Sequence, residues 1–323
     1  METEVAMDQG LFILEPQFRE RVWGGQRLRA SNPPIGEAWI AYGQSRVLNG
    51  RHAGWTLDEV VASLGPELLG SAGSRGRNGR RFPVLAKLLD CADWLSVQVH
   101  PNDEQARRMA GPDQLGKTEA WYFIETDPGA QILLGVRPGT GKDELARAIR
   151  DGRAVDVAAE VEVRSGEAVL IPAKTLHALG PGLFLYELQE ASDITYRAYD
   201  WGRPQSADRR LHIEESAEVT LPVEALERAV PLVPAGTGSC QAIACEYFEF
   251  DLVRIASEPL AADTAGRTFH LLTTTQGAVE VTCGGEAATL EPFETALIAA
   301  VAGGYSLRSM GSPATLIRAR LPG

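Results

Sequence analysis

A glycine turn, a short apolar strand, a proline and a histidine follow one another between residues 166 and 177. Gly166 begins the segment, Pro172 follows the strand, and His177 comes after a tight turn. Residues 94–100 alternate apolar and polar side chains, as a half-buried strand does. Short strands separated by glycine and proline turns therefore predict a β architecture for the middle of this chain.

Four residues in this region have side chains suited to one divalent metal ion. Gln98 and His100 are two positions apart in a predicted strand, so they share a face with their Cα atoms roughly 7 Å apart. Glu119 follows in a second alternating strand, and His177 completes the set. Imidazole, carboxylate and amide ligands without a thiolate suit zinc or another borderline divalent ion. Either histidine alone is as readily a hydrogen-bonded core residue, but both at this spacing favour a metal site.

The segment 166–177 resembles the second conserved motif of the cupin β-barrels. The first cupin motif, normally His-x-His with a later glutamate, appears here as Gln98, His100 and Glu119. From about Gln241 onward, short strands between glycines have the rhythm of an antiparallel barrel, which suggests a second and degenerate cupin. His270 is the only histidine there, and we expect no metal in that barrel.

We therefore expect a mainly β protein with a minor α component. It would contain two cupin-type β-barrels (jelly rolls), the C-terminal one degenerate, and a small helical segment at residues 143–150. A further helix is predicted after Thr56, with Thr56 as the N-cap and Glu59 in the capping-box position. The predicted domains are residues 1–225, with the metal-binding barrel, and residues 226–323, with the degenerate one.

The composition limits the partners that this protein can have. A net charge of −12 argues against a nucleic-acid or anionic-membrane partner, although a local basic pocket can still bind phosphate. The first residues lack the features of a signal peptide, and no uncharged apolar run is long enough to span a membrane. The four cysteines are scattered, as in reduced cytosolic proteins. We expect a cytoplasmic enzyme, and the sequence leaves its oligomeric state undetermined.

Five long segments resemble the type I mannose-6-phosphate isomerases, most closely the short bacterial members, and the resemblance covers essentially the whole chain. It implies a zinc-dependent aldose–ketose isomerase that interconverts mannose 6-phosphate and fructose 6-phosphate through a cis-enediol. It also implies one Zn²⁺ per chain, held by Gln98, His100, Glu119 and His177. The segments are residues 82–90 (FPVLAKLLD), 95–103 (LSVQVHPND), 116–122 (GKTEAWY), 171–179 (IPAKTLHAL) and 187–203 (ELQEASDITYRAYDWGR).

Three residues are candidates for catalysis of the isomerisation. Glu187 alternates with leucines along one strand face, and a carboxylate among aliphatic neighbours is suited to act as a general base; the alternative is a buried glutamate in a structural ion pair. Lys117 is two positions before Glu119 and should reach the same cavity, where it could steady an oxyanion or shuttle a proton between O1 and O2. Arg197 matches the family's active-site arginine, which suits phosphate clamping or enediolate stabilisation.

Ser96 and Arg203 are the candidates for phosphate binding. Ser96 is two residues before Gln98, and Arg203 stands where longer family members place a lysine. Asp193 and Asp200 are expected to orient arginines.

Two other classes of function remain open from the sequence. A cupin oxygenase with iron or manganese would need open coordination sites for dioxygen and would have no use for the basic residues around the metal. A non-catalytic sugar-binding or regulatory cupin that retains the metal site is the stronger alternative.

Overall fold

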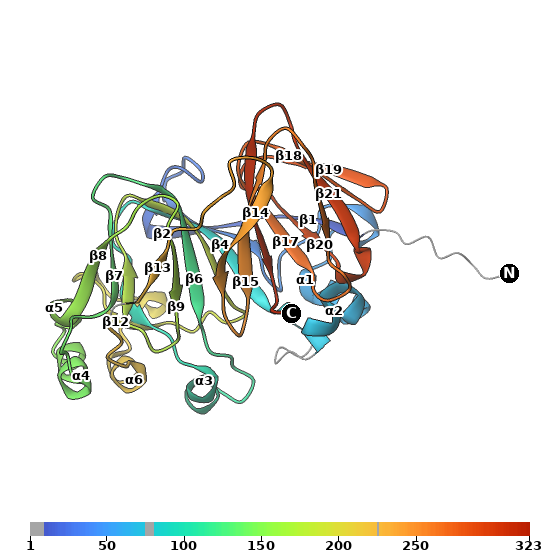
Figure 1. Ribbon diagram of the computed structural model, residues 1–323. Coiled ribbons are helices and arrows are strands. Elements are labelled where there is room, and N and C mark those ends of the chain that lie inside the picture. Colours follow the sequence, from blue (N-terminus) through green and yellow to red (C-terminus); the bar gives the residue numbers. More distant parts are fainter. Residues whose placement is uncertain (1–9, 75–80, 225) are drawn as a thin grey trace. The chain divides into compact units, whose positions relative to one another are not determined.

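The computed structural model describes residues 10–74, 81–224 and 226–323. Its strands and helices belong to two compact units, each formed by discontinuous stretches of chain (Figure 1). The central unit consists of Phe18–Ala38 and Lys87–Ala229, and the terminal unit consists of Met1–Gln17, Trp39–Ala86 and Val230–Gly323. The chain passes from one unit to the other after Gln17, Ala38, Ala86 and Ala229.

Two sheets and a group of helices build the central unit. Neighbouring strands such as β6 (Glu119–Thr126) and β11 (Leu183–Glu190) pair antiparallel. The seven-stranded sheet contains, in order, β13 (Arg228–Ala229), β9 (Ala168–Ile171), β6 (Glu119–Thr126), β11 (Leu183–Glu190), β4 (Val84–Cys91), β2 (Gln17–Gly25) and β3 (Ile35–Ala41). The five-stranded sheet contains β12 (Tyr196–Tyr199), β5 (Val97–Val99), β10 (His177–Leu179), β7 (Gln131–Val136) and β8 (Ala158–Glu162).

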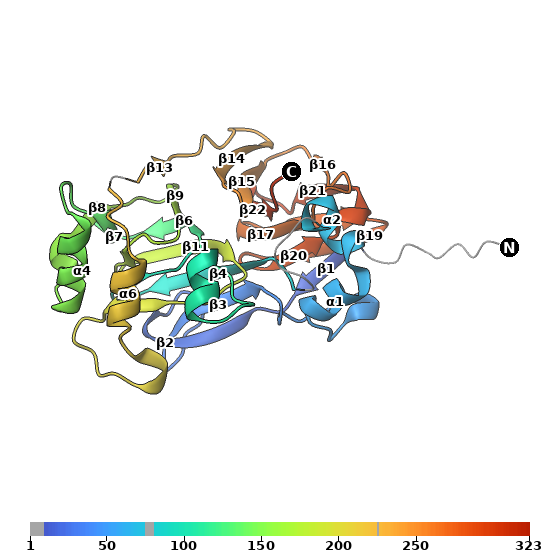
Figure 2. The same cartoon turned by 90° about the horizontal axis from the view of Figure 1, so that it is seen from below.

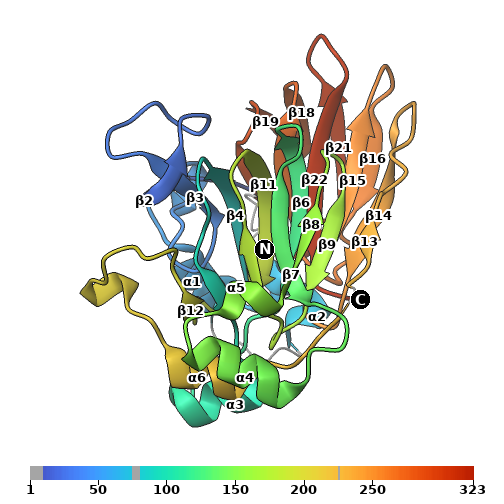
Figure 3. The ribbon, with the colours of Figure 1, turned by 90° about the vertical axis from the view of Figure 1, so that its left-hand side faces the viewer.

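The alternation along β7 shows how the five-stranded sheet uses both faces. Ile132 and Leu134 join a buried cluster with Trp121 of β6, between the two sheets. Leu133 points to the other face and packs with residues of the helices α4 (Lys142–Arg150), α5 (Ala154–Val157) and α6 (Ile213–Val219). These helices and α3 (Asp103–Met109) gather at one end of the unit (Figure 3). Strand β7 is therefore packed on both faces.

The terminal unit also has two sheets, and its core lies between them. Helices α1 (Leu57–Leu64) and α2 (Pro66–Ser74) lie side by side in this unit (Figure 2). The six-stranded sheet contains β1 (Leu11–Leu14), β20 (Thr295–Ile298), β17 (His270–Gln276), β22 (Ala314–Arg320), β15 (Glu249–Ile255) and β14 (Gly238–Ala244). The four-stranded sheet contains β16 (Leu260–Asp263), β21 (Gly304–Ser309), β18 (Val279–Cys283) and β19 (Glu286–Leu290).

The mainly β fold class with a minor helical component is confirmed. The helix predicted after Thr56 is α1, and Thr56 and Glu59 form the expected capping box. The helix predicted at residues 143–150 is α4. In the part of the chain that the structure describes, no helix is both long enough and apolar enough to span a membrane. All four cysteines have free thiols.

The compact units differ from the predicted division at residues 225 and 226. Strand β1 pairs with β20, with Leu11 opposite Ile298, so the start of the described chain belongs to the same sheet as its C-terminal part. Helices α1 and α2 belong to that unit as well. The composition of a segment does not reveal a strand partner nearly 290 residues away, and for this reason the continuous division misses the terminal unit's first strand.

Candidate metal centre

The three candidate residues Arg197, Gln98 and His177 form one row across strands β12, β5 and β10. Arg197 is the strand partner of Gln98, and Gln98 is the partner of His177. Directly opposed residues of an antiparallel pair project from the same face. Val97, next to Gln98, packs with residues of the helices on the outer face. The row therefore faces the space between the two sheets of the central unit.

His100, Glu119 and His177 converge in that space. Their candidate ligand atoms all lie within 4.8 Å of one another, and all three side chains are buried. His100 directly follows β5, His177 begins β10, and Glu119 begins β6 on the other sheet. The two imidazole rings have centroids 4.8 Å apart. Three of the four metal ligands predicted from the sequence are therefore brought together, and Gln98 lies on the same face.

The hydrogen bonds of the two histidines direct lone pairs toward Glu119. Nδ1 of His100 is 2.9 Å from the carbonyl oxygen of Ile194, and Nδ1 of His177 is 2.8 Å from that of Thr175. Because a carbonyl can only accept, each Nδ1 carries the ring proton and each Nε2 presents a lone pair. Each Nε2 lies 3.2 Å from an oxygen of Glu119. Lone pairs from three sides surround one point, which is the environment of a cation.

Buried atoms without hydrogen-bond partners also indicate that these three side chains fit a metal ion. Nε2 of His177 and Oε1 of Glu119 are buried and have no hydrogen-bond partner in the described chain. Such atoms are rare in folded proteins because leaving a buried polar atom unpaired costs free energy. A divalent ion would satisfy both of them. The nitrogen and oxygen donor set fits zinc, and a hydrogen-bonded Nδ1 on each ligating histidine is the usual arrangement in zinc sites.

Lys117 provides the positive charge nearest to this cluster. Its ammonium lies 2.7 Å from Oε2 of Glu119 and 3.0 Å from Nε2 of His100. Burial alone would raise the pKa of Glu119, but Lys117 and the neighbouring histidines hold that pKa well below its usual range. Burial and the charge of Lys117 lower the pKa of His100 to about 3. At neutral pH the site therefore presents a carboxylate and a neutral imidazole, the protonation states that metal binding needs.

A cavity of about 570 Å³ adjoins the metal ligands within the central unit. Gln98, Lys117, Glu187, Arg197 and Ser96 all line it, so the structure brings five predicted site residues to one space. Among its described lining residues, six are lysines or arginines and four are aspartates or glutamates. A pocket with excess positive charge can hold an anionic substrate although the whole chain is acidic.

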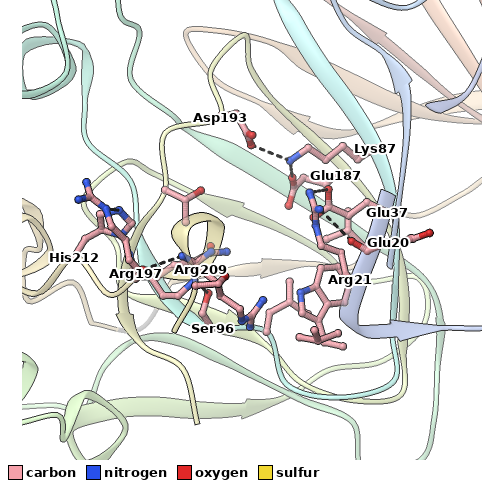
Figure 4. A pocket seen from close by; sticks show the side chains of 18 of the residues that line it. Glu20, Arg21, Glu37, Lys87, Ser96, Glu187, Asp193, Arg197, Arg209 and His212 are labelled. Atoms are coloured by element: carbon pink, nitrogen blue, oxygen red, sulfur yellow. Dashed lines mark hydrogen bonds and ion pairs between the residues drawn. The ribbon is translucent and has the colours of Figure 1, made fainter. Parts of the chain in front are cut away.

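Glu187 lies in this cavity, but the expectation of aliphatic surroundings for its carboxylate is wrong. Lys87 donates a hydrogen bond to Oε1 at 3.1 Å (Figure 4). The indole nitrogen of Trp121 donates to Oε2 at 3.0 Å. The lysine also lies 3.9 Å from Asp193, so this carboxylate contacts a lysine and not, as the sequence led us to expect, an arginine. Although burial opposes it, Glu187 raises the pKa of Lys87, so the pair is a buried ion pair. Glu187 therefore forms the structural ion pair that was the alternative to a general base, and it also lines the cavity.

Arg197 is held from two sides in an orientation toward the cavity. Its Nε donates to the hydroxyl of Ser96 at 3.1 Å (Figure 4). One terminal nitrogen donates to the carbonyl of Arg210 at 3.0 Å. Burial and the nearby Arg209 lower the pKa of Arg197. Ser96 is therefore engaged with this guanidinium, and the two predicted site residues act as a pair.

Arg203 is the predicted residue that the structure does not bring to the cavity. Its guanidinium binds Asp93 and Asp200, and it is absent from the described lining residues. Asp200 also binds Arg209, at 2.6 Å, so the expectation that Asp200 orients arginines is confirmed. Arg209 and Arg210 line the cavity instead. The loop after Asp200 therefore supplies cavity arginines that differ from the one predicted.

The sequence interpretation gave no role to several cavity residues. Lys87 is a charged residue within β4, whose eight residues are all buried, and this contrast was a usable signal. Arg21 of β2 makes a bidentate contact with Glu37 of β3, with nitrogen–oxygen distances of 3.0 and 3.1 Å (Figure 4). No local pattern marks this pair as part of the cavity.

Comparison with known proteins decides which family has this site. A family model described as phosphomannose isomerase type I, catalytic domain, matches residues 11–120. The chain is 41% identical over 223 residues to a probable mannose-6-phosphate isomerase, GmuF, of Bacillus subtilis, covering 65% of this chain and 68% of that protein. It is 40% identical over 225 residues to the mannose-6-phosphate isomerase of Streptococcus mutans, covering 66% and 68%. The chain belongs to the type I mannose-6-phosphate isomerases.

The fold agrees with this family assignment. A crystal structure of the mannose 6-phosphate isomerase from Bacillus subtilis superposes with a TM-score of 0.84 at 26% identity, over 96% of this chain and 99% of that chain. The predicted family, the cupin fold and the enzyme class, an aldose–ketose isomerase, are thus confirmed.

Proposed function

We propose that this protein interconverts mannose 6-phosphate and fructose 6-phosphate with one bound Zn²⁺ per chain. The observation that carries the proposal is the convergence of His100, Glu119 and His177, with lone pairs of both imidazoles directed at the carboxylate. Gln98 would complete the ligand set from the same sheet face. A divalent ion bound there would polarise the sugar's carbonyl and hydroxyl oxygens and offset developing negative charge.

We assign the proton transfer and the stabilisation of the developing charge to side chains of the cavity. Moving the carbonyl from C1 to C2 requires removal of the C2 proton, formation of a C1=C2 cis-enediol and return of a proton to C1. Glu187 is our candidate base for the carbon-bound proton, and Lys87 and Trp121 fix the orientation of its carboxylate. Lys117 would donate hydrogen bonds to O1 and O2 as charge develops there. Arg197, held by Ser96, would stabilise the enediolate.

The phosphate group needs a cationic subsite apart from the metal. Arg209 and Arg210 line the same cavity as Lys117 and Arg197, and Asp200 orients the first of them. A planar guanidinium can bind two phosphate oxygens at once. We therefore assign phosphate binding to Arg209, Arg210 and Ser96, and the binding of phosphate by Arg203 loses its support. A small sugar phosphate is the expected partner, and the cytoplasm is the expected location.

The test is a coupled assay on purified, zinc-loaded protein. Mannose 6-phosphate should be converted to fructose 6-phosphate, and a chelator should abolish the reaction until zinc is restored. Tight binding of the sugar phosphate without turnover would favour the non-catalytic sugar-binding alternative. Turnover that survives complete removal of the metal would contradict the metal-dependent mechanism.

A further inference from the structure

The segment 210–212, directly before α6, contacts Arg197 of β12 through its backbone and through one side chain. The backbone N–H of His212 donates to the carbonyl of Arg197 at 2.8 Å. In return, the backbone N–H of Arg197 lies 3.2 Å from Nδ1 of His212. The carbonyl of Arg210 accepts from the guanidinium of Arg197 at 3.0 Å. This short segment therefore holds both the main chain and the side chain of Arg197, and His212 lines the same cavity as Arg197 (Figure 4).

Strand β12 needs such contacts because it stands at one end of the five-stranded sheet. It pairs with β5, and no strand of the described chain lies at its other edge. Arg197 turns its N–H and its C=O to that free edge, since both contact His212. A backbone N–H without an acceptor costs free energy, so an edge strand needs another group to accept from it. At Arg197 the imidazole of His212 stands where the carbonyl of a further strand would be.

The imidazole must be neutral, with its lone pair on Nδ1, to accept from Arg197. Burial, followed by the charge of Arg210, lowers the pKa of His212, so the ring is neutral at pH 7. Nε of Arg210 lies 3.1 Å from the other ring nitrogen, Nε2, but a neutral ring can accept at only one nitrogen. Arg210 is exposed and can donate to water or to an anion instead, whereas the amide of Arg197 is fixed in its strand. We therefore assign the lone pair to Nδ1.

Neighbouring elements fix the position of His212 in turn. Its carbonyl accepts from the backbone N–H of Ser216 at 2.8 Å, which ties it to the first turn of α6. Its ring centroid lies 5.8 Å from that of Tyr196, and Tyr196 packs in a buried cluster with Val219 of α6. His212 is thus held by α6 and by β12 together, so it can transmit this rigid packing to Arg197.

We propose that His212 is a positioning residue for Arg197. Its imidazole and its backbone hold the main chain of Arg197, while Ser96 and the carbonyl of Arg210 hold the guanidinium. The role rests on the proposed function, in which Arg197 stabilises the enediolate. A donor that stabilises developing charge must stay in its productive geometry, and a small displacement lowers the rate of the chemical step. His212 acts through Arg197, without a contact of its own to the reacting carbons.

Three substitutions at His212 distinguish its two ring nitrogens. In His212→Asn the side-chain oxygen can take the place of Nδ1, and in His212→Gln it can take the place of Nε2. His212→Phe keeps an aromatic ring against Tyr196 and removes both acceptors. We expect kcat to fall about tenfold in the Phe and Gln variants, the change that corresponds to one net hydrogen bond, with KM for mannose 6-phosphate nearly unchanged. His212→Asn should recover most of the wild-type kcat.

Hydrogen exchange at the backbone amide of Arg197, followed by NMR, tests the contact without any turnover. Exchange should be at least about tenfold faster in His212→Phe and His212→Gln than in the wild type, and close to the wild-type rate in His212→Asn. Zinc content and urea denaturation of each variant control for loss of the fold. If the Phe variant is too unstable to measure, the comparison of the Asn and Gln variants carries the test.

Equal kcat values in His212→Asn and His212→Gln would overturn the proposal, and so would an exchange rate of the Arg197 amide that is the same in both. A KM that rises in His212→Phe and is restored in His212→Gln would also overturn it, because the ring would then act through Arg210. A wild-type protein without turnover would contradict the proposed function and remove the role of Arg197 with it, whereas the exchange rates would still report the contact.

Discussion

Nε2 of His177 lies 3.2 Å from Oε1 of Glu119, and both atoms are buried without a hydrogen-bond donor. Two acceptors at this distance repel each other unless a cation lies near both. The Nδ1 proton of His177 is already committed to the carbonyl of Thr175, so the ring cannot turn its other nitrogen toward the carboxylate without losing that bond. This relationship supports our proposal that the pair is part of a metal site rather than a stabilising contact of the core.

The buried pair of Lys87 and Glu187 leads to a prediction about stability. Lys87→Met removes the cation and leaves a buried carboxylate, which should lower the free energy of unfolding by about 3–5 kcal/mol. The double variant Lys87→Met with Glu187→Gln should recover part of this loss, because the uncompensated charge is gone. Urea denaturation of the wild type, both single variants and the double variant measures the coupling. Losses that simply add would show that the two residues do not interact.

Arg197 is expected to act on the reaction and not on metal binding. Arg197→Ala should lower kcat at least about 100-fold, because a donor aimed at developing charge is lost. Arg197→Lys should not restore the activity, since an ammonium cannot reach both Ser96 and the carbonyl of Arg210. Zinc content measured beside kcat distinguishes the roles, and loss of zinc in Arg197→Ala would make this arginine structural. Arg150→Ala, at an exposed ion pair with Glu214, is the control.

Substitution of Arg210 and of Arg203 should affect KM for the sugar phosphate to different extents. Arg210→Ala should raise KM for mannose 6-phosphate by about 10- to 100-fold, the range expected for a hydrogen bond to a charged group. Arg203→Ala should change KM much less, because Arg203 contacts Asp93 and Asp200 outside the cavity lining. Steady-state kinetics on both variants decides the assignment. A larger effect at Arg203 would return the phosphate site to the residue predicted from the sequence.

The lowered pKa of His270 predicts that the stability of the protein depends on pH. Its pKa is about 3 in the folded protein and about 6.5 when unfolded, so the unfolded chain binds one more proton between these values. The free energy of unfolding should therefore fall as the pH falls below about 6.5, with His270 contributing up to about 1.4 kcal/mol per pH unit. His270→Gln should reduce the slope between pH 6 and pH 4 by that amount, as measured by denaturation at each pH. At pH 8 the titration of His270 contributes no slope in either protein, and an unchanged acid slope in the variant would contradict the prediction.

Local sequence patterns were sufficient to predict much of this structure. The capping residues at Thr56 and Glu59 fixed the start of α1, and the i and i+2 spacing placed Gln98 and His100 beside each other. Each of these features depends on residues that are close in the sequence, so periodicity and side-chain chemistry reveal it.

Long-range contacts account for what the sequence did not show. The pairing of β1 with β20 and the ion pair of Lys87 with Glu187, 100 residues apart, depend on which strands become neighbours. Arg203 was the phosphate candidate because of its position in the family pattern. Which arginines of the loop after Asp200 reach the cavity depends on ion pairs of Asp200 that no sequence pattern displays.

The most direct test of the central claim is X-ray absorption at the zinc edge, combined with the zinc content of the purified protein. One ion per chain is predicted, with only nitrogen and oxygen neighbours at about 2.0–2.1 Å and a clear imidazole contribution. His177→Ala should lower the zinc affinity by about 100-fold or more, while His270→Ala, another buried histidine, should leave it unchanged. A sulfur neighbour at about 2.3 Å would contradict the assigned ligands. So would full zinc occupancy and an unchanged spectrum in His177→Ala.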